Sequence, residues 1–356
     1  MNRWLYRYFP LTVSNPFLFF YLKILSCIFF FCKRKKNIEA TSVKKILLVQ
    51  LAHLGDVVLL KSCIPSIKKK YPEALIGVLI GSWCQELFED SKEIRQHVFD
   101  HWKVNRSAGF FKKCTRCITS FFSAWQSIKA CKYDLSIDLS LFYPNSHVLT
   151  WLANIHHRIG FISGGGGELL TKSCSLQEKI LPILDEMANL FQLLDIELNL
   201  PRKTSERGDF WIFHPCSGDK SKDLPEEFWK SLYLFFKAHG QKVLFTGKSP
   251  SENSFIEKIA CLDSEEVNLC GKLSLSEVKR LAAEAKGIIC VDTFISHLAS
   301  NYHQRIFVQF NHPLHMIRWK PRYAHSICHR VVVNHENDHF SRRLWNKTFR
   351  KNPTSS

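Results

Sequence analysis

Short apolar runs alternate with amphipathic stretches along most of the chain from Val43 onward. Such runs are typical of strands buried on both faces, and the intervening stretches have the spacing of helices with one apolar side. Strands that alternate with helices form parallel sheets, so the pattern predicts an α/β fold. The expected strands are 44–51, 74–81, 97–102, 135–140, one within 209–217, 242–247, 267–271, 287–292 and 305–310. The expected helices are 57–72, 82–96, 118–134, 180–198, 225–239, 251–261 and 275–285.

A polar stretch with Pro and Gly at 201–209 interrupts this alternation and predicts a linker. The length of 356 residues also favours two domains. We expect an N-terminal domain at 43–200 and a C-terminal domain at 201–330, each with its own sheet and with a cleft between them. The basic segment 331–356 is expected to be a tail. RIGF at 158–161 and the glycines at 164–167 are expected to end the first alternating pattern, the glycines as a flexible loop.

Residues 1–42 differ from the rest, because Phe17 to Cys32 are apolar except for Lys23 and Ser26, and four basic residues follow at 33–36. Sixteen helical residues span about 24 Å, less than the roughly 30 Å of a bilayer core. Three interpretations stay open: a single membrane anchor, a segment lying in the interface, or a cleaved signal peptide, for which no small-residue cleavage site is visible. The first two predict attachment to the cytoplasmic face of the inner membrane.

The composition excludes several classes of protein. With 46% hydrophobic residues the chain is not a disordered protein. The thirteen cysteines are odd in number and scattered through apolar runs, which is typical of reduced thiols. The net charge of +17 favours an anionic partner. Residues 1–45 supply +8 of it beside the apolar segment, and the rest is expected to be spread over the body, so a membrane surface is predicted and a nucleic acid is not.

Two strand–turn–helix junctions carry candidate chemistry. In the first, Gly55 permits a tight turn after the strand at 44–51, and Asp56 begins the next helix, either as a reactive carboxylate or only as its cap. In the second, the strand at 287–292 ends at Asp292, and Thr293 and Ser296 lie in the first turn of the next helix. Free amides and hydroxyls at such a turn favour a diphosphate, whereas the alternative is a capped helix with a core histidine, His297.

A third candidate is the loop that holds Lys220 and Lys222, where a lysine either neutralises phosphate charge or is merely solvated. GKS at 247–249 resembles the end of a P-loop, but Lys242 stands where that motif needs glycine. The sequence has no DxD motif and no cysteine–histidine set at zinc spacing. No metal and no cofactor are therefore predicted.

Taken together, these segments resemble glycosyltransferase family 9, the ADP-heptose:lipopolysaccharide heptosyltransferases. The resemblance covers about Val43 to Arg330 in the same order and spacing. Its matching pieces are 46–80, 158–161, 214–229, 268–300 and 308–310.

The resemblance implies a GT-B fold, with two Rossmann-like domains whose parallel sheets face a central cleft. It implies an inverting, metal-independent transfer of a heptose-like sugar from a nucleotide diphosphate to the lipopolysaccharide inner core. The donor would be ADP-heptose, and the acceptor a lipid-anchored, anionic glycan. The implied base is Asp56, with Gly55 and His53 on the acceptor side. The implied donor-binding residues are Lys222, Asp292, Thr293, Ser296, His297, Glu252 near the ribose and Leu273 near the adenine.

The sequence also departs from the family. Phe294 replaces the glycine of the usual DTG motif, Gln50 replaces a basic residue before the LGD turn, and Ala52 and His53 replace small hydroxyl residues. These differences keep open a divergent member with another donor or acceptor, or one that binds a nucleotide sugar without turnover.

Overall fold

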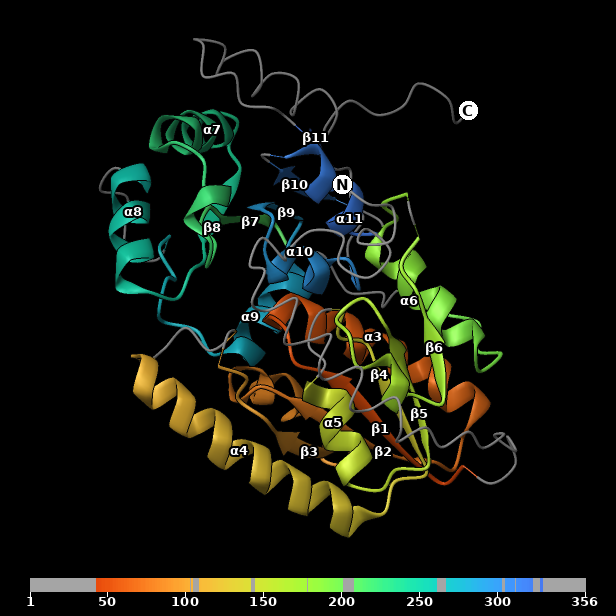
Figure 1. Cartoon of the computed structure of the whole chain (residues 1–356). Coiled ribbons are helices and arrows are strands. Elements are labelled where there is room, and N and C mark those ends of the chain that lie inside the picture. Colours follow the sequence, from red (N-terminus) through yellow and green to blue (C-terminus); the bar gives the residue numbers. More distant parts are fainter. Residues whose placement is uncertain are drawn as a thin grey trace, which may run out of the picture. The chain divides into compact units, whose positions relative to one another are not determined.

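The computed structural model describes residues 43–328 except for 103, 105–108, 142–144, 178, 201–207, 261–266, 303–304, 311 and 323–326. The chain divides into two compact units, Met1–Pro201 and Arg202–Ser356. Each unit is built on one parallel sheet (Figure 1). The expected membrane-associating segment 1–42 and the tail 331–356 lie outside the described residues. Within the described ranges, no helix is both long and apolar enough to cross a bilayer.

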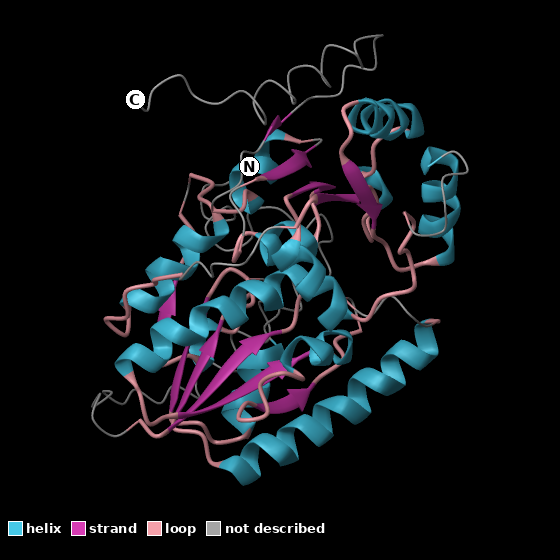
Figure 2. Cartoon of the chain, turned by 180° about the vertical axis from the view of Figure 1, so that it is seen from behind, coloured by secondary structure: helices cyan, strands magenta, loops and turns pink. Residues whose placement is uncertain are grey.

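The first unit contains a sheet of six parallel strands with helices on its faces (Figure 2). The order β3-β2-β1-β4-β5-β6 places β1 and β4 at the centre, where the change of strand order leaves a ligand-binding edge. The strands are β1 (Lys45–Gln50), β2 (Leu75–Ile80), β3 (Arg95–Val98), β4 (Leu135–Asp138), β5 (His157–Phe161) and β6 (Lys172–Cys174). The helices are α3 (Leu54–Lys70), α4 (Phe110–Cys131), α5 (Asn145–Leu152) and α6 (Ile183–Gln192).

Three local predictions for this unit are wrong. The expected helix 82–96 is a short 3₁₀ helix, Ser82–Phe88, followed by the edge strand β3. RIGF does not end the sheet, because it forms β5, and β6 extends the sheet further. The hydrophobic pattern did not reveal β5, because this strand contains a buried arginine, Arg158. The Arg158 guanidinium donates hydrogen bonds to the carbonyls of Ile155 and Leu169. Helix α4 begins eight residues before the expected start at 118.

The second unit contains a five-stranded parallel sheet in the order β11-β10-β9-β7-β8. The strands are β7 (Phe210–His214), β8 (Lys242–Phe245), β9 (Gly287–Val291), β10 (Ile306–Phe310) and β11 (Ile327–Cys328). The helices are α7 (Glu226–Ala238), α8 (Pro250–Ala260), α9 (Leu275–Glu284), α10 (Phe294–Ala299) and α11 (Pro313–Trp319). The expected strand 267–271 forms only one bridge, between Asn268 and Phe245, since the chain turns at once at Gly271, which has φ +72°.

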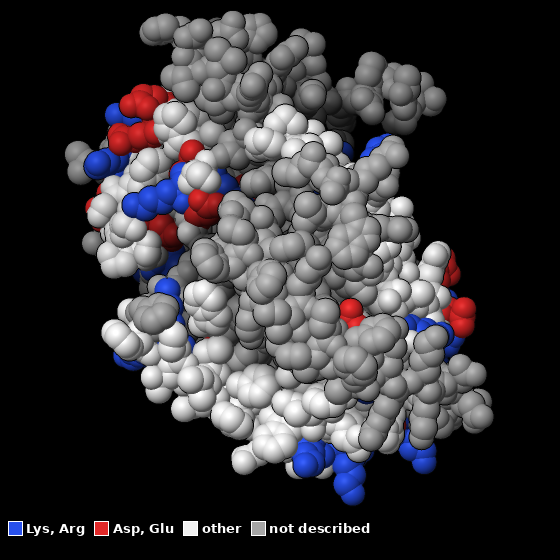
Figure 3. Space-filling model, in the orientation of Figure 1, with Lys and Arg blue, Asp and Glu red and all other residues white. Residues whose placement is uncertain are grey.

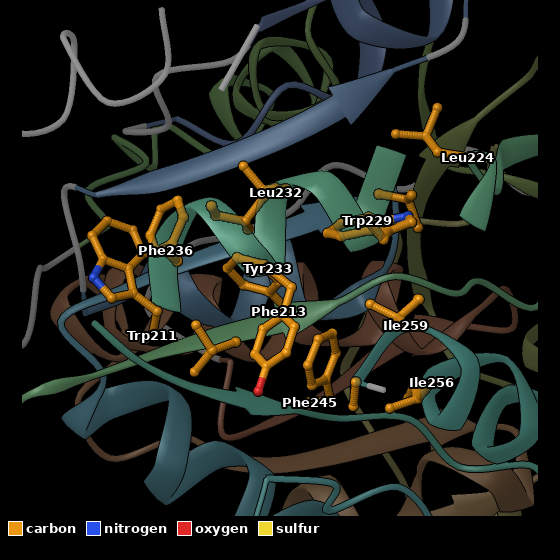
Figure 4. Packing of buried hydrophobic residues seen from close by; sticks show 14 of the residues in the cluster. Trp211, Phe213, Leu224, Trp229, Leu232, Tyr233, Phe236, Phe245, Ile256 and Ile259 are labelled. Carbon is orange, nitrogen blue, oxygen red and sulfur yellow. The ribbon is translucent and has the colours of Figure 1, made fainter. Parts of the chain in front are cut away.

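Aromatic side chains from β7, β8 and α7 form the core of the second unit (Figure 4). Phe213 lies at its centre, with ring centroids 5.2 Å from Phe236, 5.6 Å from Phe245 and 5.9 Å from Trp229. All four side chains are fully buried, and each contributes roughly 1.5–3 kcal/mol or more through the apolar surface it removes from water. This packing fixes the carboxyl ends of the strands, where the candidate donor-binding residues follow.

Candidate active site

The turn between β1 and α3 positions Asp56. His53 is the N-cap residue of α3, and the Asp56 carboxylate accepts a hydrogen bond from the His53 backbone N–H (Oδ2 to N, 3.1 Å). The side chain is half-buried at the carboxyl edge of the first sheet. The structure therefore shows the capping role that the sequence left open. The role of Asp56 as a base stays a prediction, because a capping carboxylate at this edge still carries proton-accepting oxygens.

Gln50, one of the departures from the family, braces this turn. It is buried at the end of β1, where its amide donates to the Leu139 carbonyl (3.2 Å) and accepts from the Ala52 N–H (3.3 Å). The Leu51 N–H donates to the Ser140 hydroxyl beside it (3.1 Å). These bonds tie the chain after β1 to the chain after β4 and fix the point from which α3 starts.

The same edge contains a buried pair that sequence reasoning missed. The Asp138 Oδ2 and His147 Nε2 atoms lie 3.4 Å apart, and both side chains are buried. Burial raises the pKa of Asp138 and lowers that of His147, so both groups are driven toward their neutral forms. Gly160 makes room for the pair, since a Cβ there would lie 3.1 Å from His147 Nε2. The sequence offered one signal for this pair, because Asp138 is a charged residue at the end of a buried strand.

In the second unit, Lys222 is held by Asp292. The Lys222 ammonium donates to the Asp292 carboxylate at 2.7 Å and approaches its carbonyl oxygen at 3.4 Å. Asp292 is buried, whereas the Lys222 side chain keeps 24% of its exposure. The loop is ordered by its own acids, because Asp219 accepts from the Ser221 N–H and Asp223 from the Ser217 N–H. Lys222 is thereby fixed where β9 ends and α10 begins.

Helix α10 begins at the N-cap residue Thr293, next to this ion pair. The Ser296 hydroxyl donates to the Thr293 carbonyl at 2.8 Å, so its proton serves the helix itself. His297 is buried one residue later, with its ring 6.4 Å from that of Trp319. Burial lowers the pKa of His297 to about 4, Asp292 opposes that shift and Lys222 adds to it. His297 is therefore uncharged at neutral pH.

Phe294, at the position of the family's glycine, packs within this unit. Its ring lies edge-on to His214 with centroids 5.8 Å apart. The His214 Nδ1 lies 2.9 Å from the Thr246 hydroxyl, and burial lowers the pKa of His214 to about 4. The contacts of His214 with Phe294 and with Thr246 thus link the residues that follow or end β7, β8 and β9. His214 and Thr246 were missed as site residues, although both stand at the ends of apolar strand runs.

The remaining two candidates lie after β8. The Glu252 carboxylate accepts from the backbone N–H groups of Lys248 (2.5 Å) and Ser249 (3.1 Å) and so caps α8. Burial raises the pKa of Asp223 in the Lys222 loop, and the charge of Glu252 raises it further. Leu273 is half-buried between Gly271 and α9, and no contact of it with the other candidates is found. The described residues contain no group of three His, Cys, Asp or Glu side chains that could hold a metal.

Comparison with known proteins decides the family. The model of glycosyltransferase family 9 (heptosyltransferase) matches residues 121–335, more than half of the chain. The chain belongs to glycosyltransferase family 9. The lipopolysaccharide heptosyltransferase 2 of Salmonella typhimurium is 23% identical over 289 residues, covering 72% of this chain and 79% of the relative. The lipooligosaccharide heptosyltransferase 2 of Haemophilus influenzae is also 23% identical and covers 72% of this chain and 80% of the relative.

Solved structures agree on the fold. The ADP-heptose lipopolysaccharide heptosyltransferase II of E. coli has a TM-score of 0.67 at 18% identity, over 85% of this chain and 98% of that one. A family 9 glycosyltransferase of Veillonella parvula has a TM-score of 0.66 at 18% identity, over 83% and 88% of the two chains. The predicted α/β GT-B fold is confirmed, and the protein is a glycosyltransferase enzyme of the heptosyltransferase family.

Proposed function

We propose that this glycosyltransferase moves a heptose-like sugar from ADP-heptose to the lipopolysaccharide inner core, with inversion at the anomeric carbon. The donor and acceptor named for the relatives support the substrate classes. The observation that carries the donor side is the Lys222–Asp292 pair, because it fixes an ammonium at the N-terminal end of α10. A cation and free helix amides are both favourable to a diphosphate.

The Lys222 ammonium can serve Asp292 and a phosphate together. An ammonium has three N–H donors, and the two oxygens of Asp292 take at most two of them. The remaining donor is available to a diphosphate oxygen. The backbone amides of residues 293–295 would add neutral donors, whereas the Ser296 N–H already donates to the Thr293 carbonyl. Thr293, Ser296 and His297 would shape the site. Glu252 and Leu273 are proposed for the ribose and the adenine.

In the proposed reaction, Asp56 accepts the proton of the acceptor hydroxyl while that oxygen bonds to the anomeric carbon. The bond from that carbon to the diphosphate oxygen breaks at the same time, and its electron pair leaves with ADP. The transition state has oxocarbenium character, so the developing charge on the diphosphate is what Lys222 and the amides stabilise. Gly55 and His53 would line the acceptor side. Side chains supply the positive charge, so no metal or cofactor is proposed.

The acceptor is anchored in a lipid layer, which makes a membrane surface the second proposed partner. We place the enzyme at the cytoplasmic face of the inner membrane, attached through 1–42, with the acceptor domain at 43–200 and the donor domain at 201–330. The cluster of basic residues at 33–36 supports this placement. A nucleic-acid partner is not proposed.

The test is incubation of the full chain with ADP-heptose and a heptose-free core acceptor, followed by mass spectrometry. The proposal predicts an acceptor heavier by one heptose unit and release of ADP. Donor binding without any product across a panel of nucleotide-heptoses and core acceptors would instead support a binding protein without turnover. Phe294 motivates this second candidate, because a phenyl ring occupies the position of the family's glycine.

A further inference from the structure

The outer side of α4 is apolar and basic. Nine large hydrophobic side chains are exposed in the described part of the chain, and four of them lie in or just before this helix. Phe111 is 85% exposed, Ile118 58%, Phe122 55% and the preceding Trp102 46%. Such clustering marks an interaction surface, whereas single exposed apolar residues need no explanation.

Helical geometry places these residues on one stripe that the fold does not use. Positions 111, 118 and 122 are separated by seven and four residues and so lie above one another. The core side of α4 is a different stripe, where Ala124 and Ile128 are buried and Phe121 packs edge-on against Phe99. The outer stripe therefore presents apolar side chains that folding leaves in water. Figures 1 and 2 show α4 as a long helix on the outside of its unit.

The segment of chain that contains this stripe carries charge of one sign. Residues 101–133 contain seven basic residues and no acidic one. Together with the +8 of residues 1–45, this accounts for all but +2 of the net charge. The remaining charge, expected to be spread over the body, is therefore concentrated at 101–133. Lys112, Arg116 and Lys129 are exposed on α4 itself. The edge of the molecule over α4 is white and blue in the space-filling view (Figure 3).

We infer that this outer side of α4 is a second membrane-contact surface that binds the headgroup region of an anionic lipid bilayer. Aromatic and aliphatic side chains with flanking cations and no acids are what such an interface requires. Trp125 and Lys129 extend the pattern, because the Lys129 ammonium lies over the Trp125 ring, 5.1 Å from its centroid. The inference rests on the proposed membrane partner but not on the proposed reaction.

The position-resolved test is photolabelling of the full chain on phosphatidylcholine vesicles that contain phosphatidylglycerol and a photoactivatable lipid. Mass spectrometry then locates the lipid adducts. Adducts are expected in peptides covering 110–131, in addition to any in 1–42. Peptides from α7 serve as the negative control and should show only background labelling. Adducts in 1–42 alone, or in neither segment, would overturn the inference. Because no donor or acceptor is present, the outcome is independent of whether sugar transfer occurs.

Matched variants measure the contribution of the surface. Ile118→Ser combined with Phe122→Ser should remove the α4 adducts and weaken vesicle binding by about tenfold, since two apolar contacts are lost. Leu75→Ser combined with Leu234→Ser removes two equally exposed apolar side chains elsewhere, at 62% and 49% exposure, and should change neither readout. Circular dichroism confirms that each variant is folded.

The double variant Ile118→Ser with Phe122→Ser also distinguishes a membrane from other binding partners of this surface. If wild-type α4 gains no adducts but Ile118→Ser with Phe122→Ser abolishes self-association in sedimentation, the surface belongs to a second copy of the chain and the inference is wrong. Loss of retention on single-stranded RNA under the same condition would assign the surface to nucleic acid, with the same consequence.

Discussion

The carboxyl edges of the two sheets hold their charged candidates in different ways. In the first unit, Asp56 is half-buried and its carboxylate accepts a hydrogen bond from the backbone N–H of His53, the N-cap residue of the same helix, at 3.1 Å. In the second, Lys222 pairs with a buried carboxylate 70 residues away, at 2.7 Å. The backbone N–H that caps the first site is a neutral donor, and the oxygens of a carboxylate that accepts from it can still accept a proton. The second fixes a cation and partly neutralises it, which suits reversible binding of an anion.

At each edge, residues without a proposed role in the reaction hold the candidate residues in position. Gln50 fixes the turn that carries Asp56, and the His214–Thr246 contact joins the strand ends near Lys222. The two edges should therefore respond differently to substitution: the first through the rate of transfer and the second through donor affinity.

The largest effect is expected for Asp56→Asn. Asparagine keeps an oxygen that can accept from the His53 N–H, so the helix cap survives, but the proton acceptor is lost. Turnover should fall by roughly 10²–10⁴-fold. Initial rates with saturating donor, read by product mass, measure this. Glu277→Gln is the matched control, because Glu277 caps α9 in the same way through the Ser274 N–H and should leave the rate intact. Near-normal turnover in Asp56→Asn would leave Asp56 as a cap only.

Lys222→Ala should cost on the order of 2–4 kcal/mol of transition-state stabilisation, since one charge-assisted phosphate contact is lost. The measurement is kcat/KM for the donor. Lys220→Ala is the control on the same turn, because Lys220 is exposed and no bond of it to Asp292 is found. A larger loss in Lys220→Ala than in Lys222→Ala would reverse the assignment.

Acid should weaken the fold through buried histidines. Burial lowers the pKa of His97, His214 and His297 to about 4, below the roughly 6.5 of an unfolded chain. Between these values the unfolded chain binds protons that the folded chain excludes, so the free energy of unfolding falls as the pH drops from about 6.5 to 4. The loss is on the order of 1–2 kcal/mol per histidine at pH 5.

Urea unfolding at pH 7 and pH 5 checks this for one site. His97→Gln should reduce the difference in free energy between the two pH values, because it removes one titrating group. Ser127→Ala, which deletes only the 2.8 Å hydrogen bond to His97 Nδ1, should lower stability similarly at both. An unchanged pH dependence in His97→Gln would contradict the assignment.

The smallest effect is expected on chelation. The proposed site neutralises the diphosphate with Lys222 and helix amides, so turnover should persist in EDTA. Loss of turnover in EDTA that a divalent cation restores would show that these cations are insufficient.

The hydrophobic pattern was enough to predict most of the fold. The continuous apolar runs at Lys45–Gln50 and Gly287–Val291 are strands as predicted, because a run buried on both faces is typical of a parallel sheet. It failed where a polar residue is buried with partners: β5 was missed because the buried Arg158 guanidinium donates hydrogen bonds to backbone carbonyls. It also failed for the start of α4, which was placed too late because the first turns of this helix are basic and exposed.

The candidate site was predictable only as separate motifs. Asp56 and Thr293 lie at helix starts that local sequence reveals. The pairing of Lys222 with Asp292 and of Asp138 with His147 depends on strand order, which brings distant strand ends together. Local pattern carries no information about such pairs, so their presence and their effects on charge required the structure.

The most direct test of this division between the two edges is the dissociation constant of the donor, measured by calorimetry on the full chain without acceptor. Wild type, Asp56→Asn and Lys222→Ala are compared with ADP-heptose as the ligand. The account predicts that Asp56→Asn binds within about twofold of wild type and that Lys222→Ala binds at least about tenfold more weakly. Weaker binding in Asp56→Asn together with unchanged binding in Lys222→Ala would contradict it.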